Sequence, residues 1–187
     1  MSLPVIEQPS EVFDQISGKL IERISGITVG NYDEFNGVVG DAMVLIEFER
    51  SAPANHSNDG RPGSRYRITL HGVVAKRRHR APLEAVNLTS ALQRVVTTKA
   101  DHRWGISHLA ISAPEEVSSA PSMFSGGEHG YEAWAVSFEQ VIYLGPAAPD
   151  PEATKLGDNA TGLIAWNASS DGGDASDDPN DYEQLNA

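Results

Sequence analysis

Two stretches with a period of two constrain the fold of this chain more than any other feature of its sequence. The first covers residues 42–49, where Ala42, Val44, Ile46 and Phe48 form one set and Met43, Leu45, Glu47 and Glu49 the other. The second covers residues 65–74, where Tyr66, Ile68, Leu70 and Val74 alternate with Arg65, Arg67, Thr69 and His71. Because successive side chains of a strand point to opposite faces, both stretches predict long β-strands. The connection from Ser51 to Gly63 is rich in Pro, Asn and Gly, so we predict an antiparallel, protruding hairpin with a long loop.

Two further segments have the apolar spacing of amphipathic helices. In the first, Val12, Phe13, Ile16, Leu20 and Ile24 recur at helical spacing, with Ser10 placed as the N-cap and Gly26 as the stop. In the second, Pro82 opens the helix at its first turn, and an apolar stripe follows from Leu83, Val86, Leu88, Leu92, Val95 and Val96. Each helix therefore has one face to bury.

The remaining strands are expected at residues 27–29, at residues 108–117 and from Trp134 to Leu144. Pro114 favours an edge or bulge position for the second of these, and residues 118–130 are expected to form a loop. This order predicts an α+β fold with a mainly antiparallel sheet of four to five strands and two helices packed on one face. A chain of 187 residues has room for one ordinary core, which we place in residues 1–145.

The charge of the chain is concentrated at its C-terminal end. From Pro146 to Ala187 there are nine acidic residues and one basic residue, Lys155, which accounts for −8 of the formal net charge of −12. Such a composition buries too little apolar surface to offset the entropy of ordering, so residues 146–187 are expected to form an acidic, extended C-terminal tail. Leu163, Ile164 and Trp166 interrupt it with an apolar patch, which is either a docking segment or a segment that packs back on its own sheet.

The sequence offers no catalytic signature. It has no cysteine, and its six histidines form no helical pair or His-Glu-x-x-His motif that would indicate zinc. Gly126, Gly127 and Gly130 lack the strand-to-helix context of a phosphate loop, and Glu115 and Glu116 would point to opposite faces of a strand. We therefore predict a non-enzymatic protein that uses no metal or other cofactor, and the lack of a long apolar run predicts no membrane partner.

Basic residues gather in and after the predicted hairpin. An acidic protein with a pI near 4.8 is not a typical dedicated nucleic-acid binder. The dense run from Lys76 to Arg80 is therefore a solvated connection, a surface for an anion, or a surface that attracts the acidic tail of a neighbouring copy. We take as candidate residues of an interface with another subunit or a tube the following set: Arg61, Arg65, Arg67, Lys76, Arg77, Arg78 and Arg80.

The pattern of elements over residues 10–145 resembles the tail terminator family of long-tailed bacteriophages, of the lambda and Mu types. The likeness runs from the first helix and Ser25-Gly26-Ile27-Thr28-Val29 through residues 42–49 and 65–74 to the distinctive last strand, residues 131–140. It implies a structural virion protein that forms a homohexameric ring on the head-proximal end of the tail tube and stops its polymerisation. The implied partners are the tail tube protein and a neck or head-completion protein, while DNA passes through the ring without sequence-specific binding.

Two rival interpretations stay open at the level of sequence. The chain is compatible with another phage neck, joining or tube ring subunit, because these are also small ring-formers with sheet-and-helix cores. It is also compatible with a cytoplasmic adaptor or binding domain whose acidic tail captures a basic partner. The resemblance itself implies a protein that is made in the host cytoplasm and ends in the virion, at the head-proximal end of the tail.

Overall fold

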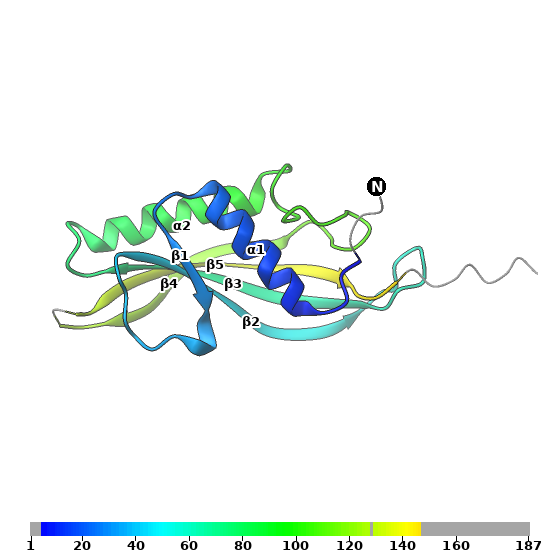
Figure 1. Cartoon of the computed structure of the whole chain (residues 1–187), viewed down its shortest axis with the longest axis horizontal. Coiled ribbons are helices and arrows are strands. Elements are labelled where there is room, and N and C mark those ends of the chain that lie inside the picture. Colours follow the sequence, from blue (N-terminus) through cyan, green and yellow to red (C-terminus); the bar gives the residue numbers. More distant parts are fainter. Residues whose placement is uncertain (1–4, 128, 147–187) are drawn as a thin grey trace, which may run out of the picture. The chain divides into compact units, whose positions relative to one another are not determined.

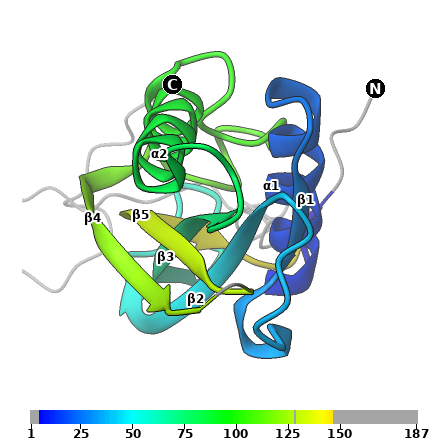
Figure 2. The same ribbon diagram turned by 90° about the vertical axis from the view of Figure 1, so that its left-hand side faces the viewer.

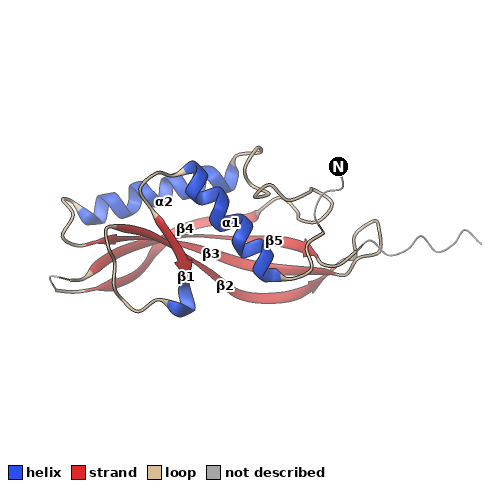
Figure 3. Ribbon diagram, viewed as in Figure 1, coloured by secondary structure: helices blue, strands red, loops and turns tan. Residues whose placement is uncertain are grey.

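The computed structural model describes residues 5–127 and 129–146, with the side chain of Phe124 left out. The chain divides into two units, residues 1–148 and 149–187, and all described residues belong to the first. Figure 3 shows the order of its helices and strands. They are α1 (Pro9–Arg23), β1 (Thr28–Asn31), the 3₁₀ helix η1 (Tyr32–Glu34), β2 (Ala42–Ala54), β3 (Gly63–Ala75), α2 (Ala81–Thr97), β4 (Glu115–Ser125) and β5 (Tyr131–Tyr143).

The described strands form one five-stranded sheet in the order β1-β2-β3-β5-β4 (Figure 1). The short β1 is parallel to β2, and the other three pairs are antiparallel. With two helices and a mostly antiparallel mixed sheet, the predicted α+β class is confirmed.

Both helices lie against the same face of the sheet, as predicted (Figure 2). The apolar stripes of α1 and α2 bury Val12, Ile16, Leu20, Leu92 and Val96 against inward-facing residues of β2, β3 and β5. Trp104 is only 1% exposed and its ring lies 5.9 Å from that of Phe138 between ring centroids. Burial of so many large side chains is the main force that holds the sheet and the helices together.

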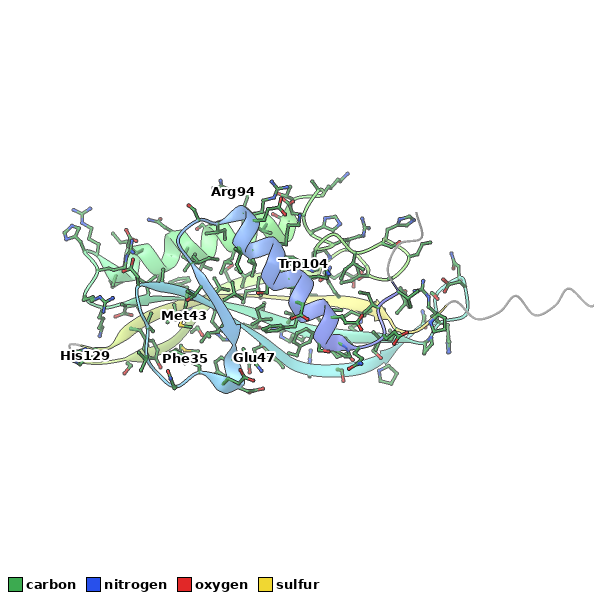
Figure 4. All side chains as sticks on the ribbon, viewed as in Figure 1. Phe35, Met43, Glu47, Arg94, Trp104 and His129 are labelled. Atoms are coloured by element: carbon green, nitrogen blue, oxygen red, sulfur yellow. The ribbon has the colours of Figure 1, made fainter. Side chains whose placement is uncertain are left out.

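The opposite face of the sheet is covered only in part. At one end, a second apolar cluster contains Val39, Leu45, Val73, Ala75 and Ala133, with Tyr32 and Phe35 of the β1–β2 connection packed on it. Figure 4 shows Phe35, Met43 and Glu47 on this side of the sheet and Trp104 on the helix side. Beyond this cluster the same face of the sheet carries polar and charged side chains, among them Glu47, Glu49, Arg50, Arg67, His71 and Glu139. We call this part of the sheet surface the open face.

The first helix begins two residues earlier than the N-cap prediction requires. Its N-cap is Gln8, whose side chain makes no capping hydrogen bond, and Pro9 occupies the first turn. The prediction that Ser10 caps the helix is therefore wrong. Proline suits the first helical position, because its φ angle is already helical and its missing N–H would have no partner there.

The predicted loop from Ser51 to Gly63 is shorter in the structure. Strand β2 continues to Ala54 and β3 starts at Gly63, and the last pair of the hairpin joins these two residues. The protrusion of the hairpin is not confirmed, because β5 pairs with β3 over its whole length, from Gly63 to Ala75. Pairing with β3 overrides the turn-forming composition of residues 51–54.

The prediction of a strand at residues 108–117 followed by a loop at residues 118–130 is wrong. The segment before Glu115 forms turns and bridges the sheet only at Ile111, opposite Ile142. The strand is β4, which covers much of the predicted loop and pairs with residues 131–139 of β5. Pro121 is tolerated because β4 is an edge strand. Glu116 has a φ of 50° at a register shift, so strict alternation does not apply to Glu115 and Glu116.

Candidate functional site

A chain of hydrogen bonds crosses the open face from β2 to β4. The His71 ring on β3 contacts Glu47 Oε2 through Nε2 at 2.9 Å and Ser122 Oγ through Nδ1 at 2.6 Å. His71 is 7% exposed, and the ring of Tyr32 stacks on it at 4.8 Å between centroids. The intervening strand β5 presents Ala135 opposite His71, and this small side chain lets the imidazole reach the edge strand.

This order of serine, imidazole and carboxylate is also the one that activates a nucleophilic serine in hydrolases. The His71 ring likewise bonds a serine hydroxyl and a carboxylate, those of Ser122 and Glu47, but it is only 7% exposed and is covered by Tyr32. Because Glu47, His71 and Ser122 come from β2, β3 and β4, their bonds link three strands of the sheet.

A β-bulge places two consecutive charged residues of β2 on the open face. The register with β3 shifts between Phe48 and Arg50, so Glu49 and Arg50 both project to the same side. Glu49 accepts a hydrogen bond from the Thr69 hydroxyl and contacts Arg67 Nε at 3.1 Å. Arg50 instead reaches over β3 to Glu139 on β5, at 3.0 Å.

Glu139 is the centre of an ion-pair cluster on this face. It is 7% exposed and has three guanidinium groups within 4.0 Å, those of Arg50 (3.0 Å), Arg65 (3.6 Å) and Arg67 (3.8 Å). The hydrogen bond from Arg50 is the main cause that lowers the pKa of the Glu139 carboxyl below its ordinary value of 4.5. Arg65 also contacts Glu115 at 2.7 Å, so the three arginines and Glu49, Glu115 and Glu139 balance one another.

The seven predicted interface residues do not form one surface. Arg61 is 7% exposed and braces the β2–β3 loop, because its guanidinium bonds Asp59 at 2.7 Å and the backbone carbonyl of Leu109 at 2.7 Å. Its hydrogen bond is the first cause that lowers the pKa of Asp59 to about 2. Arg65 and Arg67 belong to the ion-pair cluster of the open face. The charges of Arg61, Arg65 and Arg67 are thus paired with carboxylates of the same chain.

The other four predicted residues lie in the turn between β3 and α2, which we call the basic turn (residues 76–80). Arg78 is paired with Asp41 at 2.5 Å and with Glu84 at 2.9 Å, and Lys76 lies 3.5 Å from Glu132. Arg77 donates to the backbone carbonyl of Gly40, and Arg80 is exposed at a left-handed φ of 57°. These side chains line a groove of about 490 Å³ together with Ala81, Pro82, Gly127 and Glu132.

The chain of hydrogen bonds that joins Glu47, His71 and Ser122 could not be predicted from the sequence. The residues are far apart in the chain, and Ser122 falls in a segment that local composition marks as a loop. The only local signal is the small residue Ala135 on the intervening strand, which is uninformative until the strand order is known. The predicted docking residues Leu163, Ile164 and Trp166 lie outside the described residues.

Comparison with models of known protein families gave no match, and no curated protein matched the chain significantly. Within residues 5–127 and 129–146, no three His, Asp or Glu side chains are grouped so that they could hold a metal ion. None of the helices in the described part of the chain is long and apolar enough to cross a membrane.

Proposed function

We propose that this protein is a non-enzymatic subunit of a phage tail, a tail terminator that forms a ring on the head-proximal end of the tail tube. In this proposal the ring is a homohexamer that stops tube polymerisation and joins the tail to the neck. The observation that carries the proposal is the open face, a sheet surface whose charged side chains are already paired with one another.

A surface of this kind supports stacking against another protein ring. Because the arginines and glutamates hold each other in place, little side-chain entropy remains to be lost when a partner docks. Mixed charges of this type favour register and specificity between protein surfaces. They offer no excess of positive charge for DNA, which agrees with a ring through which DNA slides.

The order of elements adds support from the sequence. The residues that carry the resemblance to tail terminators form α1, β1, β2, β3, α2 and β5. A closed ring of identical subunits needs two different surfaces that fit each other. The two sides of the described domain do differ, since the helices cover one side of the sheet and the open face occupies the other.

The experiment that tests the proposal is native mass spectrometry of the purified protein, alone and with cognate tail tubes, followed by negative-stain images. A six-subunit ring, or a smaller species that assembles on one end of each tube, is the expected result. A monomer that does not bind tubes would overturn the proposal and favour the interpretation as an adaptor or binding domain.

A matched pair of variants tests the open face. Arg50 is 67% exposed at its side chain, so Arg50→Glu should disturb docking while most of the core stays intact. Arg94 is exposed on α2 (Figure 4), and Arg94→Glu makes the same charge change on the helix side. We expect tube capping to be lost only in the first variant; equal capping by both would argue against the open face.

The non-enzymatic part of the proposal has its own test. A fluorophosphonate probe reacts with activated serines, and we expect it to leave Ser122 unlabelled, because the His71 ring beside it is only 7% exposed and is covered by Tyr32. Labelling of Ser122 that disappears in His71→Ala would instead identify a serine hydrolase.

A further inference from the structure

We infer that the basic turn is a docking groove for the acidic C-terminal segment, residues 146–187, of a second copy of this chain. The inference deepens the proposed function and rests on it, because it supplies a contact between neighbouring subunits of the ring. It starts from the finding that some basic residues are paired with carboxylates of their own chain, whereas others in the described part are not.

Most of the basic residues near the sheet are neutralised within their own chain. Arg61, Arg65, Arg67 and Arg78 each have a carboxylate within 3.1 Å. By contrast, within the described residues neither Arg77 nor Arg80 has a carboxylate within 4.0 Å. Both side chains are exposed, and both line the groove at the basic turn. This groove therefore keeps two cations for an external anion.

The ligand that fits such a groove is an extended acidic peptide. The groove is an open depression of about 490 Å³, with the cations beside the apolar surface of Ala81 and Pro82. Leu83, one residue further along α2, is 57% exposed. A segment that alternates carboxylates with small and apolar residues matches both features. Residues 146–187 have nine acidic residues, and Leu163, Ile164 and Trp166 supply the apolar part.

The geometry of the sheet favours a second copy as the source of this segment. Strand β5 starts opposite Ala75, next to the basic turn, and ends at Tyr143 opposite Gly63. Twelve residues of strand separate these ends, which corresponds to roughly 40 Å. Asp150 lies only seven residues beyond Tyr143, a reach of at most about 25 Å. Asp150 and Glu152 of a chain therefore fall short of its own basic turn, so a groove that binds the whole acidic segment takes it from a second copy.

Isotope mixing tests both the groove and the source of the segment. Full-length protein grown with ¹⁴N and with ¹⁵N is mixed in urea, refolded together and treated with a carbodiimide, which joins lysine to nearby carboxylates. We expect cross-links from Lys76, which lines the groove, to peptides of residues 146–187, in hybrid ¹⁴N–¹⁵N pairs. Parental pairs alone would show docking within one chain and overturn the second copy. Absence of any Lys76 link to this segment would overturn the groove.

A binding measurement identifies the cations. A fluorescent peptide of residues 146–187 is titrated with the full-length protein at 50 mM and 500 mM salt. We expect affinity to fall at least tenfold at the higher salt and in the double variant Arg77→Glu/Arg80→Glu. The control Arg94→Glu/Lys99→Glu makes the same charge change at exposed positions of α2 and just beyond it, and should keep most of the affinity. Equal losses in both double variants would mean that net charge alone attracts the peptide.

The two proposals fail in different ways. If rings form and cap tubes while no cross-link joins Lys76 to the segment, only the docking inference is wrong. If hybrid cross-links form but the protein ignores tubes, the docking stands and the tail terminator proposal is wrong.

Discussion

Replacement of Gln140 by leucine should destabilise the domain strongly, although the two side chains are similar in size. Gln140 is 1% exposed and lies at the centre of a buried hydrogen-bond network. Its side-chain oxygen accepts from Trp104 Nε1 at 2.8 Å, and its amide nitrogen donates to the carbonyl oxygens of His102 and Ser112, each at 2.9 Å. These bonds fix the segment between α2 and β4 on the sheet.

The magnitude follows from the groups that lose their partner. Gln140→Leu leaves one indole N–H and two carbonyl oxygens without this bond, at about 1.5–2 kcal/mol for each buried group that stays unsatisfied. Burial of the more apolar leucine returns about 1–2 kcal/mol. We therefore expect a net loss of about 3–4 kcal/mol out of the roughly 5–15 kcal/mol that is typical of a domain.

Urea denaturation followed by far-UV circular dichroism measures this loss. With an m-value of about 2 kcal/mol per molar urea, the midpoint should fall by roughly 1.5–2 M. The control is Gln93→Leu, at an exposed position of α2 whose side chain only accepts a bond from Ser119 at 3.1 Å. This control should change stability by less than about 0.5 kcal/mol. A loss below about 1 kcal/mol in Gln140→Leu, or equal losses in both variants, would refute the reasoning.

Three further predictions concern the sheet and its open face. Gly63→Ala should lower the thermal midpoint, at a cost of about 1–3 kcal/mol, because the new methyl group would lie 2.3 Å from the Asn55 carbonyl oxygen. The control Gly18→Ala, where the new methyl group meets nothing within 4 Å, should instead stabilise α1 by about 0.5–1 kcal/mol. The lowered pKa of Glu139 means that its contribution is present above pH 4.5 and is lost as the pH falls below that value, so Glu139→Gln should flatten the dependence of the thermal midpoint on pH between 7 and 3. His71→Ala should cost about 1–3 kcal/mol and should speed amide hydrogen exchange in β4 more than in β2, because β4 is otherwise paired only with β5.

Local periodicity was sufficient for the elements that face the core. The period of two predicted β2, β3 and the last strand, and the helical spacing predicted α1 and α2, because in each case one face is buried. The same logic fails for β4. Its sequence, Glu115–Ser125, is rich in serine and contains Pro121, and an edge strand with little burial has no apolar alternation to detect.

The polar network of the open face depends on strand order, which the sequence does not contain. Arg67 and Glu139 are far apart in the chain and become direct neighbours only because β5 inserts between β3 and β4. The hairpin prediction alone places β2 and β3 side by side and leaves the other edge of β3 free. With that edge free, Arg65 and Arg67 would be surface cations without a carboxylate partner. For this reason they were predicted to belong to the same interface as the basic residues between Lys76 and Arg80.

The strand order therefore changes which charges are able to recruit another molecule. A guanidinium that already contacts a carboxylate must break that pair before it can bind a new anion, so Arg65 and Arg67 gain little from an external acidic group. Arg77 and Arg80 keep their charge without such a pair among the described residues, at the end of the sheet opposite the point where β5 ends. Charges that stabilise the sheet and charges that are free for association thus lie at different places on β3 and just beyond it. An acidic partner should accordingly be sensitive to substitutions at residues 76–80 and largely indifferent to substitutions at Arg65 and Arg67, although all of these residues lie between positions 65 and 80 of the sequence.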